Sequence, residues 1–144
     1  MNPPVTGQPG VVLSIGQCAA DHSRISNVMS RRWPVEVVGA ADLESAVEWL
    51  NQESRNPESV RLILVNRILD ADGESGLDVV DRLRSTPGTA EIPVMLVSNL
   101  DDAQQAAEAR GALPGFGKAA LEASETVQRI ERVLNTGSQA QSGC

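Results

Sequence analysis

The sequence has very few aromatic residues: two Trp, one Phe and no Tyr among its 144 residues. Proteins that hold single-stranded nucleic acids stack the bases on aromatic side chains, so such a platform is excluded. Cations are scarce as well, since 12 Lys and Arg stand against 19 Asp and Glu and give a formal net charge of −7. Binding to a duplex needs clustered Lys and Arg. The composition therefore predicts no nucleic-acid partner.

Cysteines, targeting signals and long apolar runs are also scarce or missing. The two cysteines, Cys18 and Cys144, do not make a disulfide framework, which favours a reducing compartment. Residues 1–10 lack the charged start and the apolar stretch of a signal peptide. No apolar run approaches the ~20 residues that a membrane-spanning helix needs. We therefore expect a cytoplasmic protein without membrane contact.

Five short aliphatic runs are the main feature that is present. They are nearly continuous and rich in β-branched residues, which is typical of strands buried on both faces of a parallel sheet. The runs cover residues 11–15, 35–38, 60–65, 92–97 and 113–117. With 41% hydrophobic residues, a chain of this length suits one domain with an aliphatic core.

A helical pattern of apolar residues follows each run. The second pattern begins at Leu43, and Asp42 before it is the predicted N-cap. The fourth pattern begins at Asp101, where negative charge favours the helix dipole, and Gly111 is predicted to end it.

The strict alternation of strands and helices predicts an α/β fold. We expect a doubly wound (βα)5 parallel sheet of the flavodoxin-like class, with strand order 2-1-3-4-5. The domain is predicted over residues 11–134. Residues 1–10 are predicted to form a flexible N-terminal segment, and residues 135–144 a flexible C-terminal tail.

Polar residues follow four of the five runs. Gln17 and Cys18 follow the first, Asn66 the third, Ser98 the fourth and Lys118 the fifth. In sheets of this kind, ligands bind beyond the carboxyl ends of the strands. These side chains therefore form the candidate functional site.

Several segments, taken in their order and spacing, resemble the receiver domain of bacterial two-component response regulators, the CheY-like family. The resemblance covers about residues 11–134 and implies a role in two-component or phosphorelay signal transduction. The segments that carry it are residues 62–66 with 76–80, 92–98, 109–112 and 117–118.

The resemblance implies a phosphoryl-transfer site. In that family, a histidine kinase donates a phosphoryl group to an Asp at the end of the third strand. That Asp and an acidic pair after the first strand hold Mg²⁺. A hydroxyl after the fourth strand and a Lys after the fifth contact the phosphoryl oxygens. The resemblance places Ser98 and Lys118 at these last two positions, so the groups that contact phosphate or another anion are retained.

Other parts of the family's site are missing. Asn66 falls on the acceptor position, Gln17 and Cys18 fall on the acidic pair, and Gly115 falls near the switch aromatic, with Phe116 one place on. A neutral amide is a far weaker nucleophile than a carboxylate, and Mg²⁺ binds through carboxylates and waters. We therefore expect a degenerate acceptor, no catalytic residue, and Mg²⁺ binding that is lost or weak.

These substitutions predict a pseudo-receiver, which is not an enzyme and acts through protein–protein contacts without phosphorylation. The resemblance implies that the fourth helix, fifth strand and fifth helix make those contacts. Expected partners are a histidine kinase, a regulator or another signalling protein, and a homodimer is a further option.

Two alternative interpretations stay open. The chain could be an anion-binding or small-ligand-binding α/β domain that uses Ser98 and Lys118, or a phosphorylatable receiver with Asp70 as a shifted acceptor. In the pseudo-receiver and in the anion-binding domain alike, Lys118 lacks the acidic residues that would balance its charge in the resembled family. It must then pair with Asp21, Asp101 or Asp102, or lie in water, because an unpaired buried ammonium is costly.

Overall fold

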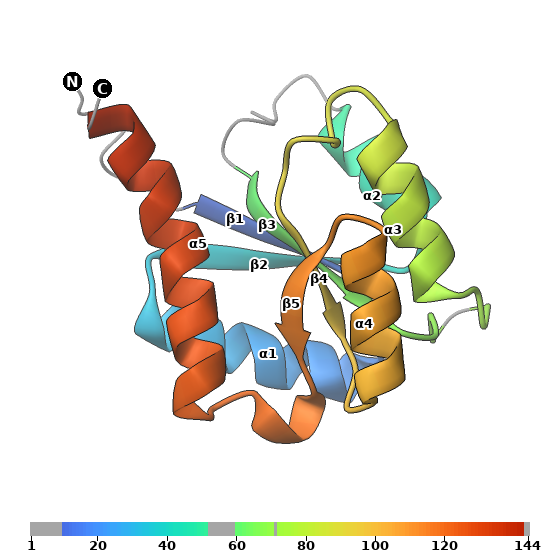
Figure 1. Ribbon diagram of the computed structural model, residues 1–144, viewed down its shortest axis with the longest axis horizontal. Coiled ribbons are helices and arrows are strands. Elements are labelled where there is room, and N and C mark those ends of the chain that lie inside the picture. Colours follow the sequence, from blue (N-terminus) through green and yellow to red (C-terminus); the bar gives the residue numbers. More distant parts are fainter. Residues whose placement is uncertain (1–9, 52–59, 71, 143–144) are drawn as a thin grey trace.

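The computed structural model describes residues 10–51, 60–70 and 72–142, and the side chains among them as far as Leu134. Strands and helices alternate along the chain (Figure 1). In order, they are β1 (Gly10–Ile15), α1 (Ala19–Arg32), β2 (Val35–Ala40), α2 (Leu43–Leu50), β3 (Val60–Asn66), α3 (Gly76–Ser85), β4 (Val94–Val97), α4 (Asp101–Ala109), β5 (Leu113–Phe116), a 3₁₀ turn (Lys118–Ala120) and α5 (Ser124–Ser142).

The five strands form one parallel sheet in the order β2-β1-β3-β4-β5, which confirms the predicted fold class. β3 is central, and its side chains from Leu62 to Val65 are fully buried. Burying a Leu or Ile side chain stabilises a fold by about 1.5–3 kcal/mol. The continuous aliphatic run of β3 therefore contributes strongly to stability, as expected for a strand covered on both faces.

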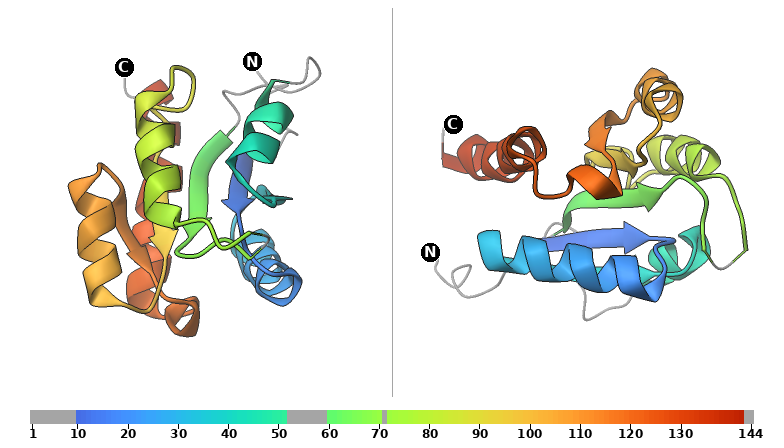
Figure 2. Two further views of the ribbon diagram at one scale, coloured as in Figure 1. Left: turned by 90° about the vertical axis from the view of Figure 1, so that its right-hand side faces the viewer. Right: turned by 90° about the horizontal axis from the view of Figure 1, so that it is seen from below.

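Helices cover both faces of the sheet. Figures 1 and 2 show α1 and α5 on one side and α2, α3 and α4 on the other. The side chains follow the same division, because successive residues of a strand point to opposite faces. On β1, Leu13 and Ile15 pack with the apolar side chains of α2, α3 and α4, whereas Val12 packs with those of α1 and α5.

The ends of several helices confirm the sequence signals. The Asp42 carboxylate accepts a hydrogen bond of 2.8 Å from the Ser45 backbone N–H, which makes Asp42 the N-cap of α2. Beyond the end of α4, Gly111 adopts a φ of +101°, a conformation that favours glycine. Among the described residues, no helix is long and apolar enough to cross a membrane.

Two predicted boundaries differ from the structure. Helix α5 continues to Ser142, past Leu134, where the tail was expected to begin. The residues after Leu134 are mostly small and polar, so their sequence carries no apolar periodicity from which a helix could be predicted. At the other end, Gly10 already belongs to β1, and the remainder of the predicted N-terminal segment lies outside the described residues.

Candidate functional site

A hollow of about 480 Å³ lies at the carboxyl end of the sheet, beyond β3 and β4. It brings together three of the predicted site residues, Asn66, Ser98 and Lys118. The other lining residues are Arg67, Ile68, Asp70, Val97, Asn99 and Leu100. The predicted residues Gln17, Cys18, Gly115 and Phe116 are not among them.

Asn66 is the last residue of β3, and only 8% of it is exposed. Its side-chain Nδ2 donates a hydrogen bond of 3.0 Å to the backbone oxygen of Gly16. Gly16 has a φ of +82°, so this oxygen belongs to the tight turn that joins β1 to α1. A carboxylate could not donate this bond, and it would lie against a carbonyl oxygen. The local structure therefore suits an amide at this position.

The same Gly16 oxygen accepts a second hydrogen bond, of 2.9 Å, from the backbone N–H of Asp70. A carbonyl oxygen has two lone pairs, and both are then used. The two bonds tie the β1–α1 turn to the end of β3 and to the connection that follows it. The Asp70 residue is exposed at the rim of the hollow. Its role as a shifted acceptor stays a prediction.

Lys118 forms an ion pair with Asp21, one of the three acids that the sequence offered beside the alternative of water. The distance from Lys118 Nζ to Asp21 Oδ2 is 2.6 Å, and the two side chains are 35% and 27% exposed. The hydrogen bond from Lys118 holds the pKa of the Asp21 carboxyl below its usual range. Arg24 adds a second link, because its guanidinium donates to the Lys118 backbone oxygen at 2.9 Å. Helix α1 is thus fastened to the connection between β5 and α5.

Replacing Asp21 by Asn is expected to lower the stability and to flatten its pH dependence in acid. Because the Asp21 pKa is lowered in the folded chain, its carboxylate stabilises the fold above the pKa of an unfolded Asp. This stabilisation is lost as the pH falls through the lower folded-state value. We expect a loss of about 0.5–1 kcal/mol at neutral pH, since both side chains are partly exposed. Urea unfolding over a pH series measures it.

Asp102→Asn is the matched control for this variant. Asp102 also lies in the first turn of a helix, and it forms no ion pair with any of the described residues. Both variants remove a negative charge that interacts favourably with the helix dipole. Only Asp21→Asn also removes an ion pair. Identical pH profiles for the two variants would contradict the prediction.

Ser98 is 8% exposed and follows the last residue of β4. Its Oγ accepts a hydrogen bond of 3.1 Å from the Leu100 backbone N–H, just before α4. A hydroxyl carries one proton in addition to its acceptor lone pairs. Ser98 can therefore still donate a hydrogen bond while it holds the turn before α4.

Gln17 and Cys18 offer no carboxylate at the entry to α1. Both polar atoms of the Gln17 side chain are buried without a hydrogen bond to any described residue, and Cys18 is a free cysteine. Among the residues that the structure describes, no group of three or more His, Cys, Asp or Glu side chains could hold a metal ion. The side chains of Gln17 and Cys18 do not fit Mg²⁺, a hard cation that prefers carboxylate oxygens and water as ligands. Weak or absent Mg²⁺ binding stays a prediction.

Gly115 lies in an irregular part of β5. Met95 pairs with Leu113 and Val97 pairs with Phe116, so two residues of β5, Pro114 and Gly115, stand opposite Leu96 alone. We call this pair the β5 bulge. A side chain at position 115 would run into the Leu96 backbone oxygen. Phe116 instead packs into the core on the α1 and α5 face and is 3% exposed.

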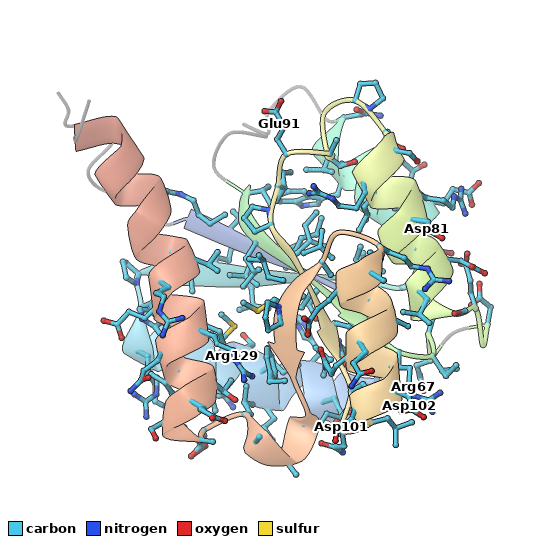
Figure 3. The ribbon with its side chains drawn as sticks, in the orientation of Figure 1. Arg67, Asp81, Glu91, Asp101, Asp102 and Arg129 are labelled. Carbon is cyan, nitrogen blue, oxygen red and sulfur yellow. The ribbon has the colours of Figure 1, made fainter. Side chains whose placement is uncertain are left out.

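Two polar residues that sequence reasoning missed bind the β5 bulge. Gln104 of α4 accepts a hydrogen bond of 3.0 Å from the Gly115 N–H. Arg129 of α5 donates one of 2.7 Å to the Gly115 oxygen and points toward β5 in Figure 3. The available signal was Pro-Gly inside a short strand, which is typical of a bulge or an edge strand. Nothing in the sequence singled out the two bonding partners.

No protein-family model matches the sequence, and no curated protein matches it either. Solved structures do match. The chain resembles NtrX from Brucella abortus with a TM-score of 0.72 and 22% identity, covering 93% of this chain but only 28% of that one. A structure of the receiver domain of NtrX alone gives a TM-score of 0.65 and 20% identity, with 87% of this chain and 98% of that one covered.

Two further proteins have the same fold. A putative response regulator from Chloroflexus aurantiacus gives a TM-score of 0.72 and 21% identity, with 88% of this chain and 98% of that one covered. A response regulator from Burkholderia pseudomallei gives a TM-score of 0.64 and 18% identity, with 93% of this chain and 72% of that one covered. Its structure holds a phosphorylated aspartic acid, a calcium ion and citrate. At these identities the comparisons show the fold, which is that of response-regulator receiver domains.

Proposed function

We propose that this chain is a receiver-like module of two-component or phosphorelay signalling that acts through protein–protein contacts and takes no phosphoryl group at position 66. The observation that carries the proposal is the hydrogen bond from Asn66 to the Gly16 oxygen. It places a neutral amide, fixed as a donor, at the end of β3. The regulator from Burkholderia pseudomallei holds a phosphorylated aspartic acid, and phosphoryl transfer of that kind needs a carboxylate nucleophile.

The charges around the hollow support the same proposal. Lys118 is engaged by Asp21 at 2.6 Å, so its ammonium already has an acidic partner. Neither Gln17 nor Cys18 supplies a carboxylate for Mg²⁺, and a phosphoryl transfer of this kind relies on a metal ion to neutralise the developing charge. Ser98 and Lys118 then have structural roles: Ser98 stabilises the connection from β4 to α4, and Lys118 stabilises the connection from β5 to α5.

The proposed contact surface consists of α4, β5 and α5. Leu113 on β5 is 37% exposed and is one of the large apolar side chains that reach solvent. The N-terminus of α4 adds Asp101 and Asp102, which lie exposed at one end of the molecule in Figure 3. A partner histidine kinase, another regulator or a second copy of the chain would meet this mixed apolar and acidic surface.

Treatment with acetyl phosphate and Mg²⁺ tests the proposal. We expect the intact mass to stay unchanged under conditions that modify a phosphorylatable response regulator treated alongside. A gain of one phosphoryl group, mapped by peptide mass to Asp70, would establish the shifted acceptor instead. Backbone amide shifts confined to Ser98 and Lys118, without a covalent adduct, would favour an anion-binding domain.

A further inference from the structure

The side chain of Gln104 bridges two strands. From its place on α4, its Nε2 donates to the Leu96 oxygen at 2.9 Å and to the Ser98 oxygen at 3.1 Å. Its Oε1 accepts from the Gly115 N–H at 3.0 Å. The amide thus supplies, at the β5 bulge, the donor and the acceptor that a regular strand pair would exchange directly.

Arg129 completes the arrangement from the other side of the sheet. Its guanidinium donates to the Gly115 oxygen at 2.7 Å, and Glu125, one turn earlier on α5, lies 4.0 Å from it. Both backbone polar groups of Gly115 are therefore bound by side chains, one from α4 and one from α5. Helices on opposite faces of the sheet are connected through a single residue of β5.

The β5 bulge leaves no room for a side chain that could move. The Leu96 backbone oxygen occupies the direction in which a Cβ of Gly115 would point. The next residue, Phe116, is buried in the core with 3% exposure. Gly115 therefore has no side chain that could change rotamer, and the buried Phe116 ring has little space to do so without movement of the backbone.

We infer that Gln104 and Arg129 hold α4, β5 and α5 in one conformation, so that this surface is preformed. The use of the surface for a partner rests on the proposed function, but its rigidity does not. Gln104 also takes part in the start of α4, because its backbone N–H donates to the Leu100 oxygen at 3.1 Å. Gln104 therefore connects the first turn of α4 to both β4 and β5.

Gln104→Leu tests the inference, since leucine keeps most of the side-chain volume and makes none of the three hydrogen bonds. In the unmodified protein, NMR relaxation dispersion is expected to be flat over residues 94–116. In the variant, exchange broadening is expected in α4 and β5. The hydrogen-exchange protection of the Gly115 amide should fall about tenfold or more, because the loss of a hydrogen bond exposes a donor that packing alone does not satisfy.

Gln105→Leu is the matched control, because Gln105 neighbours Gln104 on α4 and is exposed. It should leave dispersion and protection unchanged. Exchange over α4 and β5 in the unmodified protein, or equal protection of Gly115 in the Gln104→Leu variant, would overturn the inference. None of these readouts depends on phosphorylation. The inference can therefore fail while the proposed function stands, and the proposed function can fail while the inference stands.

Discussion

Gly115→Ala is expected to destabilise the protein by roughly 3 kcal/mol, a large part of the stability of a single domain. The added methyl group would run into the backbone oxygen of Leu96. Leu96 lies on β4, which is paired with a strand on each side, so its backbone cannot yield as a flexible side chain can. The edge strand β5 must therefore move, and its bonds to Gln104 and Arg129 must lengthen. Gly115→Phe should be worse still, and would not create a mobile aromatic residue. Urea unfolding at neutral pH gives both values.

Gly39→Ala is the matched control for that prediction. Gly39 lies on β2, the opposite edge strand, and a new Cβ there would meet the ring of His22 at 3.0 Å. A side chain on the first turns of α1 can shift by a few tenths of an ångström, so we expect a loss of no more than about 1 kcal/mol. If both substitutions cost the same, the collision with Leu96 is not what fixes glycine at position 115.

Asn66→Asp is expected to destabilise the fold by about 2 kcal/mol at neutral pH without restoring Mg²⁺ binding. The variant loses the hydrogen bond to Gly16 and places a buried carboxylate against a carbonyl oxygen that already accepts from Asp70. One carboxylate at position 66, with no carboxylate at positions 17 and 18, is a poor magnesium site. Thermal unfolding with and without Mg²⁺ measures both parts of the prediction.

The control for this second variant is Asn99→Asp, the same chemical change at an exposed position in the same hollow. The Asn99 Oδ1 accepts a bond from the Ala119 N–H, which a carboxylate can also accept, so little stability should be lost. A clear rise in melting temperature of Asn66→Asp on adding Mg²⁺ would contradict the prediction. It would mean that an acidic pair exists elsewhere in the site.

The fold was predictable because it depends on patterns that the sequence carries locally. Continuous aliphatic runs report burial on both faces, and the N-cap Asp42 needs only the residues that follow it. For Lys118 the sequence left three acids or water as alternatives, since charge balance limits the options but does not choose among them. Asp21 is selected by the position of α1 beside the end of β5, which only the packed structure gives.

The roles of Gln104 and Arg129 could not be predicted from the sequence. Each is a polar residue on a helix whose partner is a backbone group eleven or fourteen positions away. Polar residues on helices are ordinarily solvent-facing, and the bulge that exposes the Gly115 backbone arises from strand register. The donor role of Asn66 toward Gly16 is similar, because it joins residues 50 positions apart.

The β5 bulge also decides how this molecule can associate with others. β5 is an edge strand, and the edge of a sheet is ordinarily a template on which a further strand can add. Pro114 has no N–H to offer, and both polar groups of Gly115 are already bound by helix side chains. A second chain would find an interrupted row of donors and acceptors there. Growth of the sheet by strand addition at β5 is thus disfavoured, so a partner that meets β5 would contact its side chains and not extend its row of backbone hydrogen bonds.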